Sequence, residues 1–402
     1  MQIGLDLMKE LSITSPTKIV LLVIDGLGGL PHDNSGLTEL ETACTPNMDK
    51  LALLGNCGLL QTVGIGITPG SAPGHLALFG YDPFVFTIGR GALEAMGIDF
   101  DLQPGDIAAR GNFCTLDGNE LISDRRAGRI STEEGKNLCH LLDGMAVDGV
   151  RIIVQAVKEH RLVAVFRGEG LSDELSDADP QQTGVPPKEV AALAPGAERT
   201  ARIVNRFLAQ TRERLAKHYP TNMVLLRGFS KKPDFPTMAD TYKLKATAIA
   251  NYPMYSGLAK VIGMDVLKTG STLADELYTL EQNYHNYNLF FIHIKGADAA
   301  GEDGDFKRKV SVIEEVDRAL PRLLTLKPDV IVITGDHSTP AAMAAHSWHP
   351  VPCLLHSRWC RPDRLTKFSE SECRKGSLGL MPATSLMPLA MAHALKLTKF
   401  GA

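Results

Sequence analysis

Short apolar runs rich in Val, Ile, Leu and Phe recur along the 402-residue chain, with longer amphipathic stretches between most of them. Runs of this kind are typical of strands that are buried on both faces, and the stretches between them are long enough for helices. The pattern therefore predicts an α/β fold with a mainly parallel sheet flanked by helices. We expect buried strands at residues 18–25, 161–168, 222–228, 245–250, 288–294 and 329–336.

The segment 45–55 carries the start and stop signals of a helix. Thr45 is a suitable N-cap, Pro46 follows it at the first helical position, and Gly55 is suited to the C-cap. We therefore expect a helix between these two caps.

The sequence changes character after about residue 105 and returns to the first pattern near residue 225. Turn-rich stretches such as DGNELISD and SDELSDADPQQTGVPP occupy this interval, together with a basic helical run between Arg199 and Arg214. We interpret residues 106–225 as a smaller α/β domain that is inserted into a core formed by residues 1–105 and 226–402.

Charge and hydropathy argue against two classes of partner. Lys and Arg total 42 and Asp and Glu total 46, so a formal net charge of -4 provides no overall positive field that would attract nucleic acid. No apolar run approaches the roughly 20 residues of a membrane-spanning helix, and the amino-terminal residues lack the pattern of a secretory signal. We expect a cytoplasmic protein that binds neither nucleic acid nor membrane, and the sequence leaves its oligomeric state open.

The seven cysteines are scattered along the chain and include no CxxC pair. This spacing argues against a disulfide framework and against a zinc–thiolate site. We therefore expect free thiols.

Several of the predicted strands are followed by side chains that bind metals. Asp25 ends the first strand, Asp298 comes soon after the fifth, and Asp336 with His337 follows the sixth. A single Asp in this position is more often a helix cap than a ligand. In an open parallel sheet, however, sites form at the carboxyl ends of the strands, so these residues are expected to converge. Carboxylates and imidazoles suit Mn²⁺, Zn²⁺ or Mg²⁺ better than a soft metal.

Two nearby segments extend this group. Glu302 lies four residues after Asp298 in GADAAGEDGD, which places both carboxylates on one face if the segment is helical; an acidic, solvated loop is the alternative. In HSWHPVP, His346 and His349 are each either a ligand or a satisfied surface imidazole. Spacing alone does not choose between these two histidines.

Ser71 is the candidate nucleophile. It stands next to Gly70 and close to Gly74 in PGSAPGH, and such small neighbours let a bulky phosphate approach. A serine at the start of a helix lies where backbone N–H groups and the helix dipole stabilise an anion. A bound metal would also lower the pKa of the hydroxyl. A plain N-cap is the structural alternative for this residue.

Taken together, the motifs resemble those of one known family. The segments VLLVIDGLGGLP, TPNMDKLA, GRGALEA, DRRAGRI, HIKGADAAG, GDHSTP and HSWHPVP are similar to those of archaeal-type cofactor-independent phosphoglycerate mutases of the alkaline phosphatase superfamily. The resemblance implies an alkaline-phosphatase-like core, an inserted substrate-binding domain, a phosphoserine intermediate and no bisphosphoglycerate. It also implies two divalent metal ions, for which Mn²⁺ is favoured and Zn²⁺, Co²⁺ or Mg²⁺ are alternatives.

The resemblance divides the metal ligands into two sets. One metal would be held by Asp25, Ser71, Asp336 and His337, and the other by Asp298, residue 302 and His346. The family pattern has a histidine four residues after the Asp of KGxDxxG, whereas this chain has Glu302. Either Glu302 substitutes as an oxygen ligand, or the second site is weakened and its metal preference altered. We favour substitution, because carboxylate oxygens bind the same hard dications.

Arginines of the inserted domain are the expected ligands of the substrate. Two dications would offset the carboxylates of the core, so the charges of a phosphorylated acid would fall to guanidinium groups, whose planar fork binds carboxylate or phosphate through two hydrogen bonds. The residues expected to bind phosphoglycerate are Asp124, Arg125, His160, Arg167 and Arg227. Asp124 would orient an arginine or a substrate hydroxyl, and His160 is a candidate proton shuttle.

The expected reaction is the interconversion of 3-phosphoglycerate and 2-phosphoglycerate in glycolysis and gluconeogenesis. Ser71 would take the phosphoryl group, and the glycerate would reorient and take it back at its other hydroxyl while water is excluded. One alternative is a phosphatase or phosphotransferase of the same superfamily that acts on another metabolite. The other is a catalytically silent paralogue that binds a metabolite or a partner.

Overall fold

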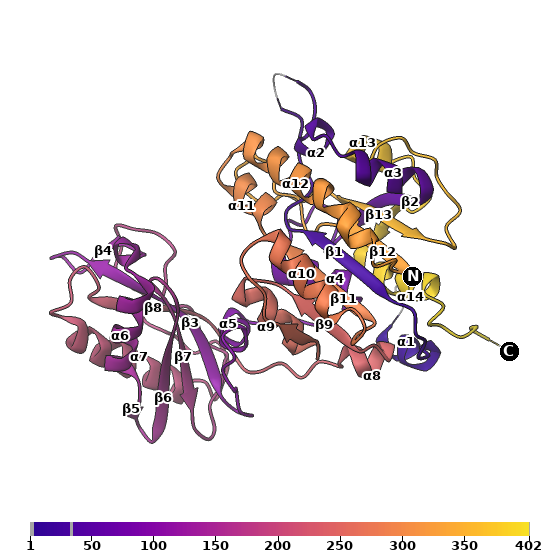
Figure 1. Cartoon of the computed structure of the whole chain (residues 1–402). Coiled ribbons are helices and arrows are strands. Elements are labelled where there is room, and N and C mark those ends of the chain that lie inside the picture. Colours follow the sequence, from indigo (N-terminus) through magenta and orange to yellow (C-terminus); the bar gives the residue numbers. More distant parts are fainter. Residues whose placement is uncertain (1–3, 33–34, 402) are drawn as a thin grey trace. The chain divides into compact units, whose positions relative to one another are not determined.

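A computed structural model describes residues 4–32 and 35–401 (Figure 1). The chain forms two compact units: the first consists of residues up to 87 and from 235 onward, and the second is Ile88–Asp234. The predicted insertion at 106–225 lies within the second unit.

The first unit is built on an eight-stranded, mainly parallel sheet, as predicted. The strand order is β10-β9-β11-β1-β12-β13-β2-β14, and β13 alone among these strands runs antiparallel to its neighbours. The strands are β1 (Ile19–Ile24), β2 (Asn56–Gln61), β9 (Ala246–Ile249), β10 (Asp265–Leu267), β11 (Leu289–Ile294), β12 (Val330–Thr334), β13 (Val351–Ser357) and β14 (Gly379–Pro382). Four predicted strands therefore correspond to β1, β9, β11 and β12.

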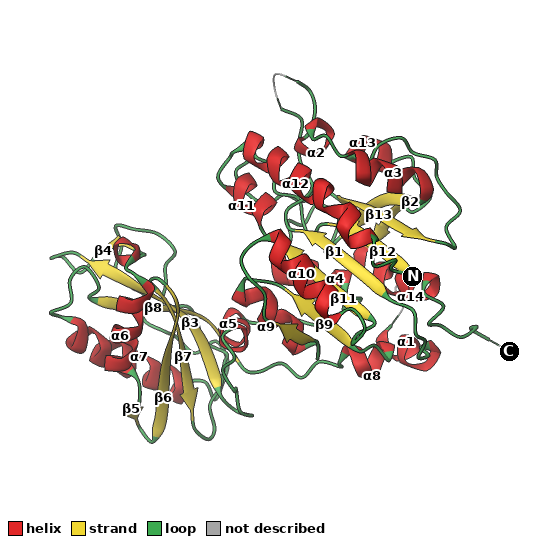
Figure 2. Cartoon of the chain, viewed as in Figure 1, coloured by secondary structure: helices red, strands yellow, loops and turns green. Residues whose placement is uncertain are grey.

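Helices enclose the strands of the first unit (Figure 2). They are α1 (Leu5–Leu11), α2 (Glu39–Thr42), α3 (Pro46–Leu54), α4 (Ser71–Leu78), α8 (Met238–Tyr242), α9 (Pro253–Val261), α10 (Leu273–Asn283), α11 (Gly296–Glu302), α12 (Phe306–Leu324), α13 (Glu370–Cys373) and α14 (Leu386–His393), with a 3-10 turn, η2, at Ala383–Ser385. α3 confirms the predicted helix, and Thr45 and Gly55 are its caps. The Thr45 side chain, however, makes no capping hydrogen bond.

The central strands are buried on both faces, which explains their continuous apolar sequence. Phe290 of β11 belongs to the same hydrophobic core as Leu277 of α10 and Val316 of α12. The next residue, Phe291, points to the opposite face, where its ring centroid lies 5.0 Å from that of Phe79 at the end of α4. Successive residues of one strand thus pack against different helical layers.

The second unit is built on an antiparallel sheet with the order β4-β3-β7-β6-β5, and β8 also pairs with β3. Its elements are α5 (Arg90–Gly97), β3 (Ile107–Leu116), β4 (Ile122–Asp124), η1 (Ala127–Arg129), α6 (Thr132–Leu142), β5 (Met145–Val147), β6 (Val150–Lys158), β7 (Arg161–Arg167), α7 (Glu198–Leu215) and β8 (Met223–Ser230). The remaining predicted strands, at 161–168 and 222–228, correspond to β7 and β8 of this sheet and lie outside the parallel one.

Helix α5 belongs to the second unit because it packs tightly on β3 and β8. A Cβ on Gly91 of α5 would lie 2.0 Å from the carbonyl oxygen of Ala108, so only glycine permits this approach. The backbone N–H of Ala92 donates to the Ser230 hydroxyl at 2.9 Å. Through these contacts, residues on the amino-terminal side of β3 also belong to the second unit.

Two further expectations concern cysteines and membranes. The seven cysteines are free thiols, as predicted. Within residues 4–32 and 35–401, no helix has both the length and the apolar composition needed to cross a bilayer.

Candidate functional site

The candidate site lies at the carboxyl ends of β11, β1 and β12, which are adjacent parallel strands of the first unit. Asp25 directly follows β1, Asp336 and His337 follow β12 after one glycine, and Asp298 lies on α11, which begins just after β11. The side chains of these four residues are fully buried. The topology therefore brings together residues that are more than 300 positions apart, as the strand-end pattern predicts.

Asp25, Asp336 and His337 form the first compact group of ligand-type side chains. His337 Nε2 lies 3.2 Å from Asp25 Oδ1 and 3.2 Å from Asp336 Oδ2. Both oxygens are buried and accept no hydrogen bond from any described residue. Because buried carboxylate oxygens require a partner, this donor set fits a bound cation.

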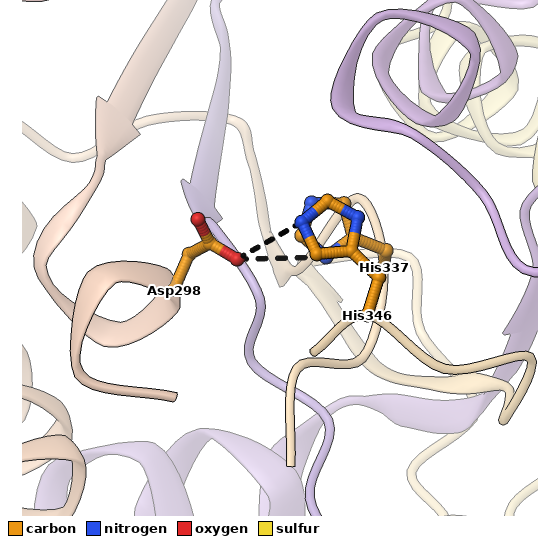
Figure 3. Close-up of side chains that lie close together, drawn as sticks. All are labelled: Asp298, His337 and His346. Atoms are coloured by element: carbon orange, nitrogen blue, oxygen red, sulfur yellow. Dashed lines mark ion pairs between the residues drawn. The ribbon is translucent and has the colours of Figure 1, made fainter. Parts of the chain in front are cut away.

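Asp298, His337 and His346 form the second group, which Figure 3 shows. Asp298 Oδ1 lies 3.4 Å from His346 Nε2 and 3.9 Å from His337 Nδ1. The two imidazole rings stack with their centroids 3.7 Å apart. His337 is thus a member of both groups. The family resemblance implies that it is a ligand of the first metal.

Glu302 lies at the edge of the second group. It ends α11, so the predicted helical turn is present, but its side chain is 55% exposed whereas that of Asp298 is buried. Glu302 Oε1 lies 3.7 Å from His346 Nε2. His349 belongs to neither group, and its Nδ1 hydrogen bonds with the hydroxyl of Ser347 at 3.0 Å.

Ser71 is the first residue of α4, and Gly70 is its N-cap. Its Oγ lies 3.2 Å from His337 Nε2, next to the first group. A Cβ on Gly74 would lie 2.3 Å from the carbonyl oxygen of Asp336, so glycine at this position lets α4 approach the loop after β12. The helix N-terminus therefore presents the hydroxyl and its backbone N–H groups at the strand ends.

Sequence reasoning missed four side chains that support the ligands. Lys295 and Tyr255 both donate hydrogen bonds to Asp25 Oδ2, and His293 Nε2 lies 3.0 Å from the same oxygen. His75 Nδ1 lies 3.1 Å from Asp336 Oδ2 and 2.8 Å from the carbonyl oxygen of Ser71. Lys295 also forms an ion pair with Asp298. The signals in the sequence were that Lys295 and His293 lie three and five residues before Asp298, and that His75 lies one helical turn after Ser71.

These contacts shift the protonation equilibria of the site. Burial disfavours the charged form of Asp25, but its close contacts with His293 and His337 and the positive charge of Lys295 outweigh burial and hold the pKa of Asp25 well below its ordinary value. Burial also opposes ionisation of Asp298, yet its contacts with His346 and Lys295 lower its pKa to about 2. The carboxylates are therefore charged at neutral pH and available as ligands.

The expected substrate residues lie in the second unit. Arg125 forms two hydrogen bonds with Asp179, at 3.1 and 2.6 Å, and Arg227 Nε lies 3.9 Å from the same carboxylate. Arg167 forms an ion pair with Asp106 at 2.6 Å.

Asp124 and His160 occupy different positions from those arginines. The Asp124 carboxylate accepts hydrogen bonds from the backbone N–H groups of Arg126 and Gly128, so it stabilises a turn and makes no hydrogen bond to an arginine side chain. His160 is buried, and burial together with the charge of Arg161 lowers its pKa to about 4. His160 immediately precedes β7 and Arg167 ends it, so their backbones lie roughly 20 Å apart by the rise of a strand.

Two further arginines accompany Arg227. Arg110 lies directly opposite Arg227 in the pairing of β3 with β8. Like charges at opposed positions destabilise a sheet unless other charges offset them. Burial and the charges of Arg110 and Arg90 lower the pKa of Arg227 to about 10. Asp179 lies beside Arg227 and Glu94 lies 3.9 Å from Arg110, so two charges offset part of the repulsion, and the remaining positive charge suits an anionic ligand.

Comparisons with known proteins point to one family. The family model for 2,3-bisphosphoglycerate-independent phosphoglycerate mutase matches residues 52–222. A probable 2,3-bisphosphoglycerate-independent phosphoglycerate mutase from Thermus thermophilus is 50% identical over 98% of this chain and 98% of its own length. Another from Aquifex aeolicus is 49% identical over 99% of this chain and 100% of its own length.

Solved structures give the same result. A protein from Pyrococcus horikoshii superposes with a TM-score of 0.84 at 30% identity, covering 97% of this chain and 100% of that one. The cofactor-independent phosphoglycerate mutase from Thermoplasma acidophilum superposes with a TM-score of 0.69 at 29% identity, covering 94% and 100%. These relatives share about 50% sequence identity with the chain over nearly its whole length. The chain therefore belongs to the 2,3-bisphosphoglycerate-independent phosphoglycerate mutase family.

Proposed function

We propose that this chain interconverts 3-phosphoglycerate and 2-phosphoglycerate by way of a phosphoserine at Ser71, with two divalent cations bound at the strand ends of the first unit. The observation that carries the proposal is the position of the Ser71 hydroxyl, 3.2 Å from His337 Nε2, at two adjoining groups of carboxylate and imidazole ligands. Among the divalent ions that the family resemblance implies, we favour Mn²⁺.

Charge balance supports two dications. Asp25, Asp298 and Asp336 are buried carboxylates, and Lys295 forms ion pairs with two of them. These four groups leave two negative charges, and Glu302 as a further ligand would make three, so two dications would leave the site with a net positive charge. A phosphate ester carries about two negative charges at neutral pH and would offset that positive charge.

Asp25, Asp336 and His337 would hold the first cation beside Ser71, and Asp298 and His346 would hold the second, with Glu302 as a further oxygen ligand. When bound, the cations would lower the pKa of the Ser71 hydroxyl and neutralise charge on the transferring phosphoryl group. The unpartnered oxygens of Asp25 and Asp336 are suited to this binding.

The residues of the chain perform the remaining steps. Ser71 Oγ attacks the phosphorus of 3-phosphoglycerate, the ester bond to the substrate oxygen breaks, and glycerate is released from the phosphorus. The 2-hydroxyl of the same glycerate then attacks the phosphoserine, which regenerates Ser71 and yields 2-phosphoglycerate. Arg125 and Arg227 are proposed to hold the carboxylate of the substrate, because paired guanidinium groups bind planar anions through two hydrogen bonds.

Phosphorus NMR tests the proposal directly. The metal-stripped chain is mixed with 3-phosphoglycerate, without bisphosphoglycerate, in the absence and presence of Mn²⁺, and Ser71→Ala is compared with Ser311→Ala. Ser311 is a matched control because its hydroxyl bonds to the carbonyl oxygen of Lys307 on α12, away from the site. We expect 2-phosphoglycerate only with Mn²⁺ and an intact Ser71. Inorganic phosphate as the sole product would indicate a phosphatase, and no reaction with any divalent ion would refute the proposal.

A further inference from the structure

A buried lysine lies behind the loops that carry the metal ligands. Lys309, in the first turn of α12, is 0% exposed. Its Nζ donates hydrogen bonds to the carbonyl oxygens of Gly28 at 2.9 Å and Thr339 at 2.8 Å. Gly28 belongs to the loop that begins with Asp25, and Thr339 belongs to the loop that begins with Asp336. One ammonium group therefore hydrogen bonds to both ligand loops.

Thr339 connects Lys309 to the ligand side chains. Its hydroxyl donates to Asp298 Oδ1 at 2.7 Å and lies 2.9 Å from His337 Nδ1. Since the single hydroxyl proton is used on Asp298, the Thr339 oxygen accepts a hydrogen bond from Nδ1–H of His337. This hydrogen bond leaves Nε2 of His337 with a free lone pair, and Nε2 is the atom that faces Asp25, Asp336 and Ser71.

Two buried acids hold the same loops from the other side. Glu39 Oε1 lies 3.7 Å from Lys309 Nζ and accepts the N–H of Ala341 at 2.7 Å. Glu370 accepts the N–H of Gly29 at 3.0 Å. Burying charges is unfavourable unless they are paired or hydrogen bonded, and each of these charges contacts a ligand loop, although Glu39 Oε2 accepts no hydrogen bond from the described residues.

We propose that Lys309 is a positioning residue of the metal site. By fixing the carbonyl groups of Gly28 and Thr339, it holds the Thr339 hydroxyl between Asp298 and His337 and so sets the spacing of the ligands and the tautomer of His337. Lys309 makes no contact with the ligand atoms themselves. The inference rests on the proposed function, because it concerns the cations which that function requires.

The test measures the binding of Mn²⁺ alone to the metal-stripped, full-length chain by isothermal titration calorimetry. We expect Lys309→Met to weaken Mn²⁺ binding about 10- to 100-fold, the usual effect of losing a group that orients a metal ligand. At limiting Mn²⁺, kcat should fall while KM for phosphoglycerate stays within about twofold, because Lys309 acts on the ligands and not on the substrate.

Lys396→Met is the matched control. Lys396 is also a buried lysine of the first unit, and its Nζ donates to the carbonyl oxygen of Ser15 at 2.7 Å, in a segment without metal ligands. This variant loses the same kind of hydrogen bond and should bind Mn²⁺ like the wild-type chain. A loss of affinity in both lysine variants would mean that general destabilisation is responsible, which would overturn the proposed role of Lys309.

Thr339 provides a second route if Lys309→Met does not fold. Thr339→Val removes the hydroxyl and should weaken Mn²⁺ binding to a similar degree, and Thr339→Ser should restore it. Wild-type affinity in either Lys309→Met or Thr339→Val would overturn the inference. Failure of the wild-type chain to bind Mn²⁺ would instead overturn the metal dependence in the proposed function, so the two failures are distinguishable.

Discussion

His293 Nε2 lies 3.0 Å from Asp25 Oδ2, the carboxylate oxygen that does not face His337. Tyr255 and Lys295 donate to the same oxygen. The other oxygen, Oδ1, accepts no hydrogen bond from the described residues. Three groups therefore orient Asp25 through Oδ2, and Oδ1 is left to bind a metal ion.

The first prediction concerns this orientation. His293→Phe removes one hydrogen-bonding group from Asp25 while keeping a ring of similar size between α4 and the sheet, where His293 stacks on Tyr255. We expect Mn²⁺ affinity to fall about 10- to 100-fold, with the fold preserved by circular dichroism. His356→Phe is the control, because His356 pairs with Ile331 near the amino end of β12, away from the ligands. Equal affinities in the two variants would show that His293 has only a packing role.

The sequence was sufficient to predict that these ligand-type side chains converge, because parallel topology constrains where strand ends lie. Asp25, Asp336 and His337 each follow an apolar run, and the adjacent positions of β1 and β12 then bring them together. The N-terminal position of Ser71 on α4 could be predicted for a similar reason, since Gly70 and Gly74 mark a close approach.

The supporting residues could not be predicted in this way. His293 and Tyr255 lie inside regular elements and are indistinguishable, by pattern, from ordinary core residues. Lys309 lies in a polar stretch of α12, where a lysine is normally solvated. Arg110 becomes informative only when the pairing of β3 with β8 places it opposite Arg227, and that pairing depends on register, which the sequence does not display.

The second prediction is a pH dependence of stability that does not involve the metals. Glu276 on α10 is 2% exposed, and burial together with the charge of Asp275 raises its pKa to about 8. Between the ordinary pKa of glutamate and about 8, the folded chain therefore binds more protons than the unfolded chain. The contribution of Glu276 to stability is fully present at pH 4 and is lost as the pH rises through this interval.

Glu276→Gln should remove this loss, because the amide stays neutral and can still accept the hydrogen bond that Asn251 donates at 3.1 Å. We expect a gain of a few kcal/mol in the free energy of unfolding at pH 8, on the order of the shift in pKa, and no gain at pH 4. Urea unfolding of the metal-stripped chain measures both values. Glu281→Gln, on the same helix, should instead destabilise near neutral pH because its ion pair with Arg322 lowers the pKa of Glu281. A pH-independent effect of Glu276→Gln would contradict the argument.

The third prediction tests whether Glu302 is a ligand of the second metal. Glu302→Gln should weaken binding of the second equivalent of Mn²⁺ about 10-fold while leaving the first equivalent unchanged, because the carboxylate charge is lost. Glu302→His should retain binding with a shifted preference from Mn²⁺ toward Zn²⁺, since imidazole suits zinc. Asp303→Asn controls for surface charge, because Asp303 is exposed and paired with Arg308. Unchanged stoichiometry and affinity in both Glu302 variants would remove Glu302 from the site.

The last prediction separates stability from substrate binding at Arg227. In the substrate-free chain, Arg227 repels Arg110 and Arg90, which is part of the reason its pKa is lowered to about 10. Arg227→Met relieves that repulsion and keeps an aliphatic side chain of similar length, so the thermal midpoint should stay the same or rise. If Arg227 binds the substrate as proposed, the same variant loses a charge-assisted contact, and KM for 3-phosphoglycerate should rise about 10- to 100-fold. Arg206→Met is the matched control, because Arg206 lies on α7 and pairs with Asp148 at the surface; it should leave KM unchanged. A lower midpoint with an unchanged KM would mean that Arg227 stabilises the second unit and does not bind the substrate, whereas a raised KM with an unchanged or higher midpoint is expected only where the positive charges are held together for an anion.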